Sequence, residues 1–249
     1  PMAHLKLVRM VVAMIKQQDF KIGIMDFITE LDIAFQKIAS KESATPMENY
    51  MKNKFSFLGI KTEPRRTVFK KLYEKHKSEI KANFRNMIWE LLNKTEREFH
   101  YVALDLSIKE FKKNYLQEDI NLIEKLITTN SWWDTVDAFA KYLVGGYLHQ
   151  FPKETYVVIE HFSNSKNMWL NRTAILFQLS YKEKTNFDLL KAECEKHKHS
   201  NEFFIQKAIG WALRDYSRFN PDGVSNYVTS TNLKPLSKRE AIRNLHKNL

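Results

Sequence analysis

Trp133 and Asp137 stand four residues apart, so a helix would place the indole ring and the carboxylate side by side on one surface. That surface could be a joint site for chemistry. A core helix gains nothing from an unpaired carboxylate, because burying a charge without a partner costs several kcal/mol. The alternative is structural, in which Asp137 caps a loop or forms an ion pair with an arginine.

Further cationic and aromatic side chains follow toward the C-terminus. Arg172 comes first, and Trp211 and Arg214 then lie about one helical turn apart. Basic residues interleaved with aromatic residues suit a nucleic-acid groove, because the cations bind phosphates and the rings stack on sugars or exposed bases. Each tryptophan could instead fill the core, and this interpretation is favoured for Trp89 and Trp169.

Basic residues exceed acidic ones over the whole chain. There are 40 Lys and Arg residues against 29 Asp and Glu residues, which gives a formal net charge of +11. This charge favours polyanions, nucleic acid first and anionic membranes second, whereas the alternative is a solvated basic surface with no partner. The further cations that could contact phosphates, or simply be solvated, are Lys52, Arg65, Arg66, Lys70, Lys71, Lys207, Lys238 and Arg239.

The elements that carry these residues are expected to be helices. Glycine and proline are scarce, with six of each, and apolar residues recur at helical spacing between the prolines. Thr95 with Glu98 and Ser237 with Glu240 match the capping box that begins a helix. Most prolines fall where helices should begin or end, at Pro46, Pro64, Pro152, Pro221 and Pro235.

A weak internal repeat orders these helices. An aromatic residue precedes a small or inward-facing residue by four or five positions, and these second residues are 34, 37 and 34 positions apart. They are Ala103, Asp137, Ala174 and Ala208, so one repeat carries an acid where its siblings carry alanine. A period of this size predicts an all-α solenoid of stacked antiparallel helix pairs, similar to HEAT repeats, with a basic concave face.

Residues 46–249 are expected to form one domain, because no low-complexity sequence or long linker interrupts them. Residues 1–45 form an N-terminal extension with an amphipathic helix from Phe20 to Lys41. The apolar stretch from Leu5 to Ile15 is too short to span a bilayer, so no membrane association is expected. One cysteine, Cys194, excludes an intrachain disulfide framework and favours a reducing compartment. We therefore expect a cytoplasmic protein.

Cys194, His197 and His199 resemble a cluster of metal ligands. They lie on one polar segment rich in Lys and Glu, so surface positions are the favoured interpretation and no metal is expected.

Several motifs resemble the AlkD family of DNA alkylation repair proteins. They are YMKNKFSFLGIKTEPRR (50–66), SWWDTVD (131–137), WLNRTAILFQLSYK (169–182), FFIQKAIGWALRDY (203–216) and LSKREAI (236–242). The resemblance runs from about Pro46 to the end and does not cover the first 45 residues. It implies HEAT-like repeats and excision of N3- and N7-alkylated purines from double-stranded DNA, without metal or organic cofactor, in base excision repair.

The resemblance also assigns residues. The active-site aromatics fall on Trp133 and Trp211, the catalytic carboxylate on Asp137 and the supporting arginine on Arg172. Tyr50 and Arg214 match positions that line the DNA near the lesion. The resemblance further implies a monomeric, DNA-associated protein of bacterial origin. A non-catalytic HEAT-like protein that binds DNA or a protein partner is the alternative function.

Overall fold

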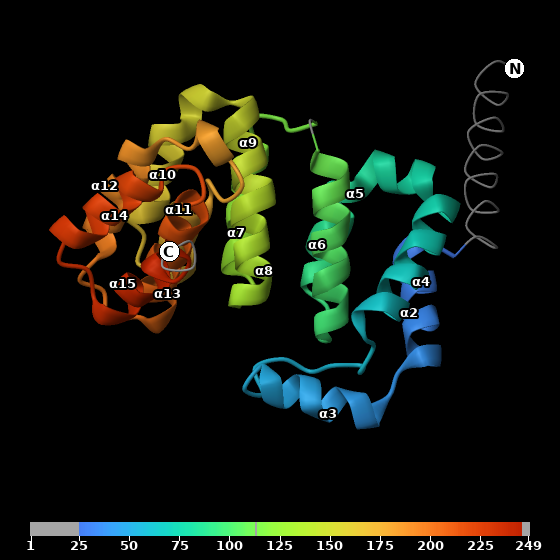
Figure 1. The fold of residues 1–249 in the computed structure, drawn as a ribbon. Coiled ribbons are helices and arrows are strands. Elements are labelled where there is room, and N and C mark those ends of the chain that lie inside the picture. Colours follow the sequence, from blue (N-terminus) through green and yellow to red (C-terminus); the bar gives the residue numbers. More distant parts are fainter. Residues whose placement is uncertain (1–24, 113, 246–249) are drawn as a thin grey trace, which may run out of the picture. The chain divides into compact units, whose positions relative to one another are not determined.

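The computed structural model describes residues 25–112 and 114–245, and these residues contain helices and connecting segments without a β-strand (Figure 1). The prediction of an all-α protein is therefore confirmed. The chain divides into two compact units, residues 1–83 and 84–249, which we describe separately. Helix α5 (Lys77–Leu92) crosses this division, and its backbone leaves helical geometry at Asn83, where φ is −140°.

The first unit is built on α2 (Phe27–Ile38), α3 (Lys41–Tyr50) and α4 (Thr62–Lys75). Asp26 caps α2, because its carboxylate accepts a 2.8 Å bond from the Thr29 N–H. The helix predicted from Phe20 to Lys41 is confirmed only as α2, and its first residues, like the stretch from Leu5 to Ile15, lie outside the described part of the chain. Pro46 was expected at a helix boundary but lies inside α3.

Apolar side chains and one histidine join α2 to α4. Phe27 and Leu31 of α2 are fully buried, and the Phe27 ring makes an edge contact with Phe69 of α4. His76, which follows α4, contacts Glu79 through Nδ1 at 2.9 Å and Glu30 of α2 through Nε2 at 3.0 Å. The first unit therefore has its own apolar core and its own hydrogen bonds between side chains of different helices.

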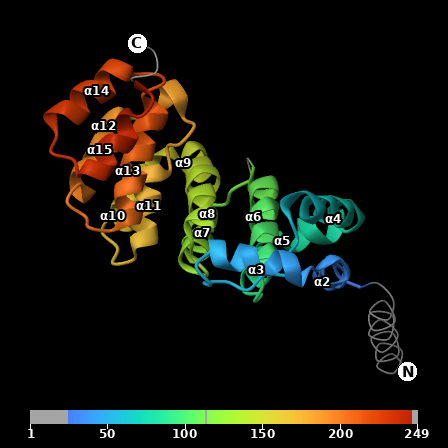
Figure 2. The same cartoon turned by 60° about the horizontal axis from the view of Figure 1, so that its bottom comes forward.

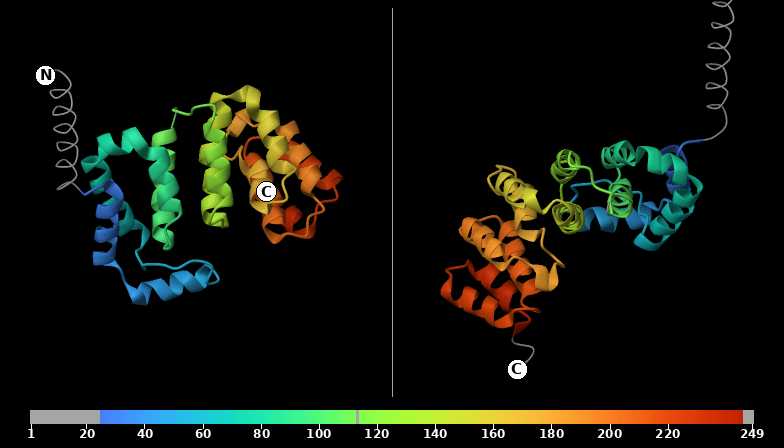
Figure 3. Two further views of the ribbon diagram at one scale, coloured as in Figure 1. Left: turned by 180° about the vertical axis from the view of Figure 1, so that it is seen from behind. Right: turned by 90° about the horizontal axis from the view of Figure 1, so that it is seen from above.

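The second unit contains a row of helices that contact one another in sequence. This row runs through α6 (Arg97–Phe111), α8 (Trp133–Ala138), α11 (Met168–Leu176), α13 (Phe203–Tyr216) and α15 (Pro235–Ile242), and each of these helices contacts the next. Helices between the members of this row include α7 (Asp119–Thr128), α10 (Thr155–Ser163), α12 (Phe187–His197) and α14 (Pro221–Ser230). Figures 2 and 3 show the later helices, orange to red, stacked against one another.

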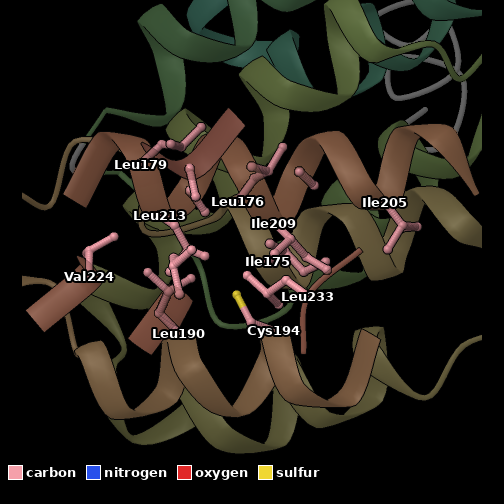
Figure 4. Close-up of a cluster of buried hydrophobic side chains, with 14 of the residues drawn as sticks. Ile175, Leu176, Leu179, Leu190, Cys194, Ile205, Ile209, Leu213, Val224 and Leu233 are labelled. Carbon is pink, nitrogen blue, oxygen red and sulfur yellow. The ribbon is translucent and has the colours of Figure 1, made fainter. Parts of the chain in front are cut away.

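The predicted repeat register matches this row. Ala103, Asp137, Ala174 and Ala208 fall on α6, α8, α11 and α13, and all four are buried. Aliphatic side chains of α11, α12, α13 and α14 form the core around the last repeats (Figure 4). Asp137 is thus the buried acid in a series of buried alanines.

Both predicted capping boxes are wrong. Helix α6 begins at Arg97, with Glu96 at its N-cap, so Thr95 lies one position too early. Helix α15 begins at Pro235, because proline is pre-organised for the first helical position, and Ser237 therefore lies inside the helix. The Ser237 hydroxyl donates to the Gln206 carbonyl at 3.0 Å instead.

Helix α8 runs directly into a π-helical segment, η1 (Phe139–Val144), and then into α9 (Gly145–Gln150). Two tyrosines support the wider turn: the Tyr115 hydroxyl donates to the Tyr142 carbonyl at 2.9 Å, and the Tyr181 hydroxyl donates to the Gly145 carbonyl at 2.6 Å. A Cβ at position 146 would lie 2.4 Å from the Tyr115 hydroxyl, so a glycine is needed for this close approach. Single π turns in α-helices occur frequently at functional sites, and this one begins two residues after Asp137.

Candidate active site

A bidentate ion pair joins Asp137 of α8 to Arg172 of α11. The Arg172 Nε–H donates to Oδ1 at 2.6 Å and Nη2–H donates to Oδ2 at 2.7 Å. Arg172 also donates through Nη1 to the Phe204 carbonyl, and its guanidinium lies 5.8 Å from the centre of the Phe204 ring. Both partners are nearly buried, with 7% exposure for Asp137 and 3% for Arg172, so the carboxylate is held in one orientation.

Burial and charge act in opposite directions on Asp137. Loss of solvent raises the pKa of its carboxyl above the ordinary value, and the nearby Asp134 adds to this rise. The hydrogen bonds and positive charge of Arg172 lower the pKa and oppose the rise. Arg172 therefore favours the ionised form of this carboxylate, whereas burial favours the protonated form.

Asp137 and Arg172 line a pocket of about 260 Å³. Trp133 of α8 lies on the same wall as Asp137, and Trp211 of α13 lines the pocket with 36% of its surface exposed. Lys207 and Arg214 belong to the same face of α13 as Trp211. The structure thus brings together the four residues predicted to be catalytic and two of the predicted DNA contacts, although their roles stay predictions.

Phe203, Phe204 and Glu240 also line this pocket. The sequence indicated Phe204 only as the aromatic residue before Ala208 in the repeat and Glu240 only as part of a capping box, and it did not single out Phe203. The Glu240 carboxylate contacts Lys207 Nζ at 2.9 Å and Arg214 Nη1 at 2.6 Å. A pattern of aromatic and basic residues gives no signal for an acid between the two cations. The sequence offers a signal for Phe203, because it is adjacent to the aromatic residue Phe204. In the structure Phe203 begins α13, and 57% of its surface is exposed.

Aromatic rings pack behind the pocket. Trp132 lies with its ring centre 5.9 Å from that of Trp169 and 5.3 Å from that of Phe204, and Trp169 and Phe204 are 5.1 Å apart. The core interpretation of Trp169 agrees with this packing. For Trp89 it is wrong, since 37% of that side chain is exposed.

A second arginine fixes the other side of α8. Arg97 of α6 is fully buried and bonds Asp134 at 2.5 Å, the Asn130 carbonyl at 2.7 Å and the Thr135 hydroxyl at 3.0 Å. The Tyr101 hydroxyl donates to the other Asp134 oxygen at 2.7 Å. Helix α8 has only six residues. One carboxylate joins it to each neighbouring helix of the row, Asp134 to α6 and Asp137 to α11.

Replacing Arg97 with methionine is expected to destabilise the protein by about 3–5 kcal/mol, because a partly buried Asp134 carboxylate would lose its cationic partner. Urea unfolding followed by circular dichroism measures this loss. The double variant Arg97→Met with Asp134→Asn should recover part of it, because the unpaired charge is then gone. A loss below about 1 kcal/mol, typical of a surface ion pair, would contradict this expectation.

The remaining predicted DNA contacts do not belong to this pocket. Tyr50, Lys52 and Arg66 lie in the first unit with exposed side chains, whereas Arg65 of that unit is buried with 6% exposure. Lys70 and Lys71 are exposed on α4. Lys238 and Arg239 are exposed on α15. All of these stay predictions as DNA contacts.

The cysteine and histidine cluster has a different structure from the one expected. Cys194 is fully buried in the apolar core, where its sulfur points into the cluster of Figure 4, and is not a surface residue. His197 Nε2 instead lies 2.8 Å from the Ser163 hydroxyl, which donates to Glu193. Within the described residues, no group of three His, Cys, Asp or Glu side chains is arranged to hold a metal ion.

Comparison with known proteins identifies the family of the chain. The family profile described as DNA alkylation repair enzyme matches residues 31–245. The chain therefore belongs to the DNA alkylation repair enzyme family, and its partner in that role is DNA.

The chain is also similar to a solved structure from Enterococcus faecalis, described as a predicted DNA alkylation repair enzyme. The two are 36% identical, with a TM-score of 0.77 over 84% of this chain and 97% of the other. No curated protein matches the chain. In the described segments, no helix combines the length and the apolar character needed to cross a membrane.

Proposed function

We propose that this protein is a DNA glycosylase that hydrolyses the N-glycosidic bond of cationic N3- or N7-alkylated purines in double-stranded DNA. The observation that supports this most directly is the Asp137 carboxylate, held by Arg172 at a pocket that Trp133 and Trp211 also line. A purely structural ion pair would need neither the two tryptophans nor the pocket. The proposal thus gives each of these residues a role in one reaction.

The alkylated base supplies much of the driving force. Alkylation at N7 of guanine or N3 of adenine places a positive charge on the ring. When the bond from C1′ to the base breaks, its electron pair moves to the base, which leaves as a neutral purine, and no strong general acid is required. The deoxyribose becomes an oxocarbenium-like cation, water adds to C1′, and one proton is released.

Asp137 would stabilise that cation and orient the attacking water, because the attraction between a fixed, nearly buried carboxylate and a cation at C1′ is weakened little by solvent. Arg172 would keep the carboxylate ionised and aimed. Trp133 and Trp211 would offer ring faces to the cationic nucleoside, a contribution of roughly 0.5–2 kcal/mol per contact. An undamaged, neutral purine gains no such contribution, so the damage would be selected by its charge.

The size of the pocket favours recognition without complete base flipping. Its volume of about 260 Å³ is below the roughly 300–1,000 Å³ of ordinary ligand pockets. The open wall of Trp133, Asp137 and Trp211 could contact the deoxyribose and the edge of the base from the backbone side. A complex in which the lesion base is fully extruded into a protein cavity would overturn this part of the proposal.

The proposed activity predicts that the purified protein releases 7-methylguanine from methylated double-stranded DNA in buffer with a chelator and without added metal. Chromatography of the released bases measures the product, and unmethylated DNA is the control. Folded protein that binds DNA but releases no base would favour a DNA-binding role instead. A HEAT-like scaffold for a protein partner would show neither base release nor DNA binding.

A further inference from the structure

Helix α13 presents a charged and aromatic face to the pocket. Lys207, Trp211 and Arg214 follow the spacing i, i+4 and i+7, so they lie along one side of the helix with Trp211 between the two cations. Gly210 occupies the i+3 position of the same side. A Cβ there would lie 2.4 Å from the Glu240 Cβ and 2.9 Å from the Ser237 carbonyl oxygen, so the glycine permits α15 to approach α13 at this point.

This approach places one carboxylate between two cations. Glu240 contacts Lys207 through Oε1 at 2.9 Å and Arg214 through Oε2 at 2.6 Å, and the residue is 8% exposed. The bond from Lys207, followed by that from Arg214, lowers the pKa of the Glu240 carboxyl. Glu240 is therefore ionised at neutral pH.

The charges around the pocket nearly balance. Three cations, Arg172, Lys207 and Arg214, face two carboxylates, Asp137 and Glu240. Without the Glu240 charge, the same wall would carry two uncompensated positive charges. All these groups line one pocket, so a cationic base bound there would be repelled by the excess positive charge.

We propose that Glu240 is a specificity-determining residue of this site. It holds Lys207 and Arg214 in position for a DNA phosphate and offsets enough of their charge to limit binding of undamaged DNA and to admit a positively charged base. This inference rests on the proposed glycosylase function for its substrate. Its effect on undamaged DNA is independent of catalysis.

Glu240→Gln is the first test, because glutamine keeps the shape of the side chain and removes the charge. For undamaged duplex DNA, the slope of log K against log salt concentration is expected to steepen by about 0.9, the value for one additional phosphate contact. The ratio of affinities for a 7-methylguanine duplex and an undamaged duplex is expected to fall by roughly threefold to tenfold, because the released positive charge is partly screened by water. Fluorescence anisotropy and single-turnover excision measure the two quantities.

Three further variants separate charge from structure. Glu195→Gln removes an equal charge from α12, where Glu195 bonds Lys198 at 2.6 Å outside the pocket, and should change neither quantity. Glu240→Asp should retain the wild-type slope. The double variant Lys207→Met with Glu240→Gln restores the balance of charges and should return the slope toward the wild-type value.

Two results in folded Glu240→Gln protein would contradict the proposal. An unchanged slope in folded Glu240→Gln protein would overturn the proposal. A proportional loss of binding to damaged and undamaged DNA would also overturn it, because Glu240 would then only tie α15 to α13. If the wild-type protein releases no 7-methylguanine, the proposed function fails, whereas the slope on undamaged DNA still tests Glu240.

Discussion

Asp137→Asn is expected to lower the single-turnover rate of 7-methylguanine release by at least about 10²-fold, the usual effect of removing one fixed electrostatic group from a reacting centre. Affinity for undamaged DNA should change less than in Glu240→Gln, because the released partner Arg172 is 3% exposed and the cations of α13 keep their contacts with Glu240. The amide keeps the size of the side chain but carries no charge to stabilise a sugar cation. Release of base measured by chromatography, beside duplex binding measured by anisotropy, separates the two effects.

Asp119 provides a matched control for this variant. It is 2% exposed and accepts bonds from Arg85 Nε at 2.6 Å and Nη2 at 2.8 Å, nearly the geometry of Asp137 with Arg172, and it lies outside the pocket. Asp119→Asn should therefore destabilise the fold as Asp137→Asn does but retain base release. Equal activities in the two folded variants would contradict a catalytic role for Asp137.

The repeat was visible in the sequence because each helix of one row must bury the equivalent position. Ala103, Ala174 and Ala208 bury a methyl group there, so an acid at position 137 was recognisable as an exception. The sequence left open whether Asp137 was functional or paired with an arginine. In the structure the pair with Arg172 and the pocket occur together, so the two interpretations are compatible.

Other features depended on contacts that no local pattern specifies. The position of Glu240 between Lys207 and Arg214 requires α15 to approach α13 at Gly210, and neither helix indicates this partner by itself. The Arg97 bond to Asp134 likewise joins residues 37 positions apart. Local rules also failed at Ser237, where a proline two residues earlier determined the start of the helix.

Arg172→Met is expected to shift the acid limb of the pH–rate profile to higher pH, because a neighbouring arginine lowers the pKa of an aspartate. Activity requires the ionised form of Asp137, which is lost as the pH falls through its pKa. Burial already raises this pKa, and the bonds from Arg172 oppose the rise. Removing them raises the pKa further, so activity is lost at a higher pH.

The same substitution leaves a buried carboxylate without its partner, so a loss of stability of about 3–5 kcal/mol is also expected. Rates must therefore be measured below the unfolding temperature of each variant. Arg85→Met is the control, because it removes the equivalent bonds from Asp119 and should lower stability without moving the pH profile. An acid limb unchanged in Arg172→Met would contradict the proposal that Arg172 keeps Asp137 ionised during the reaction.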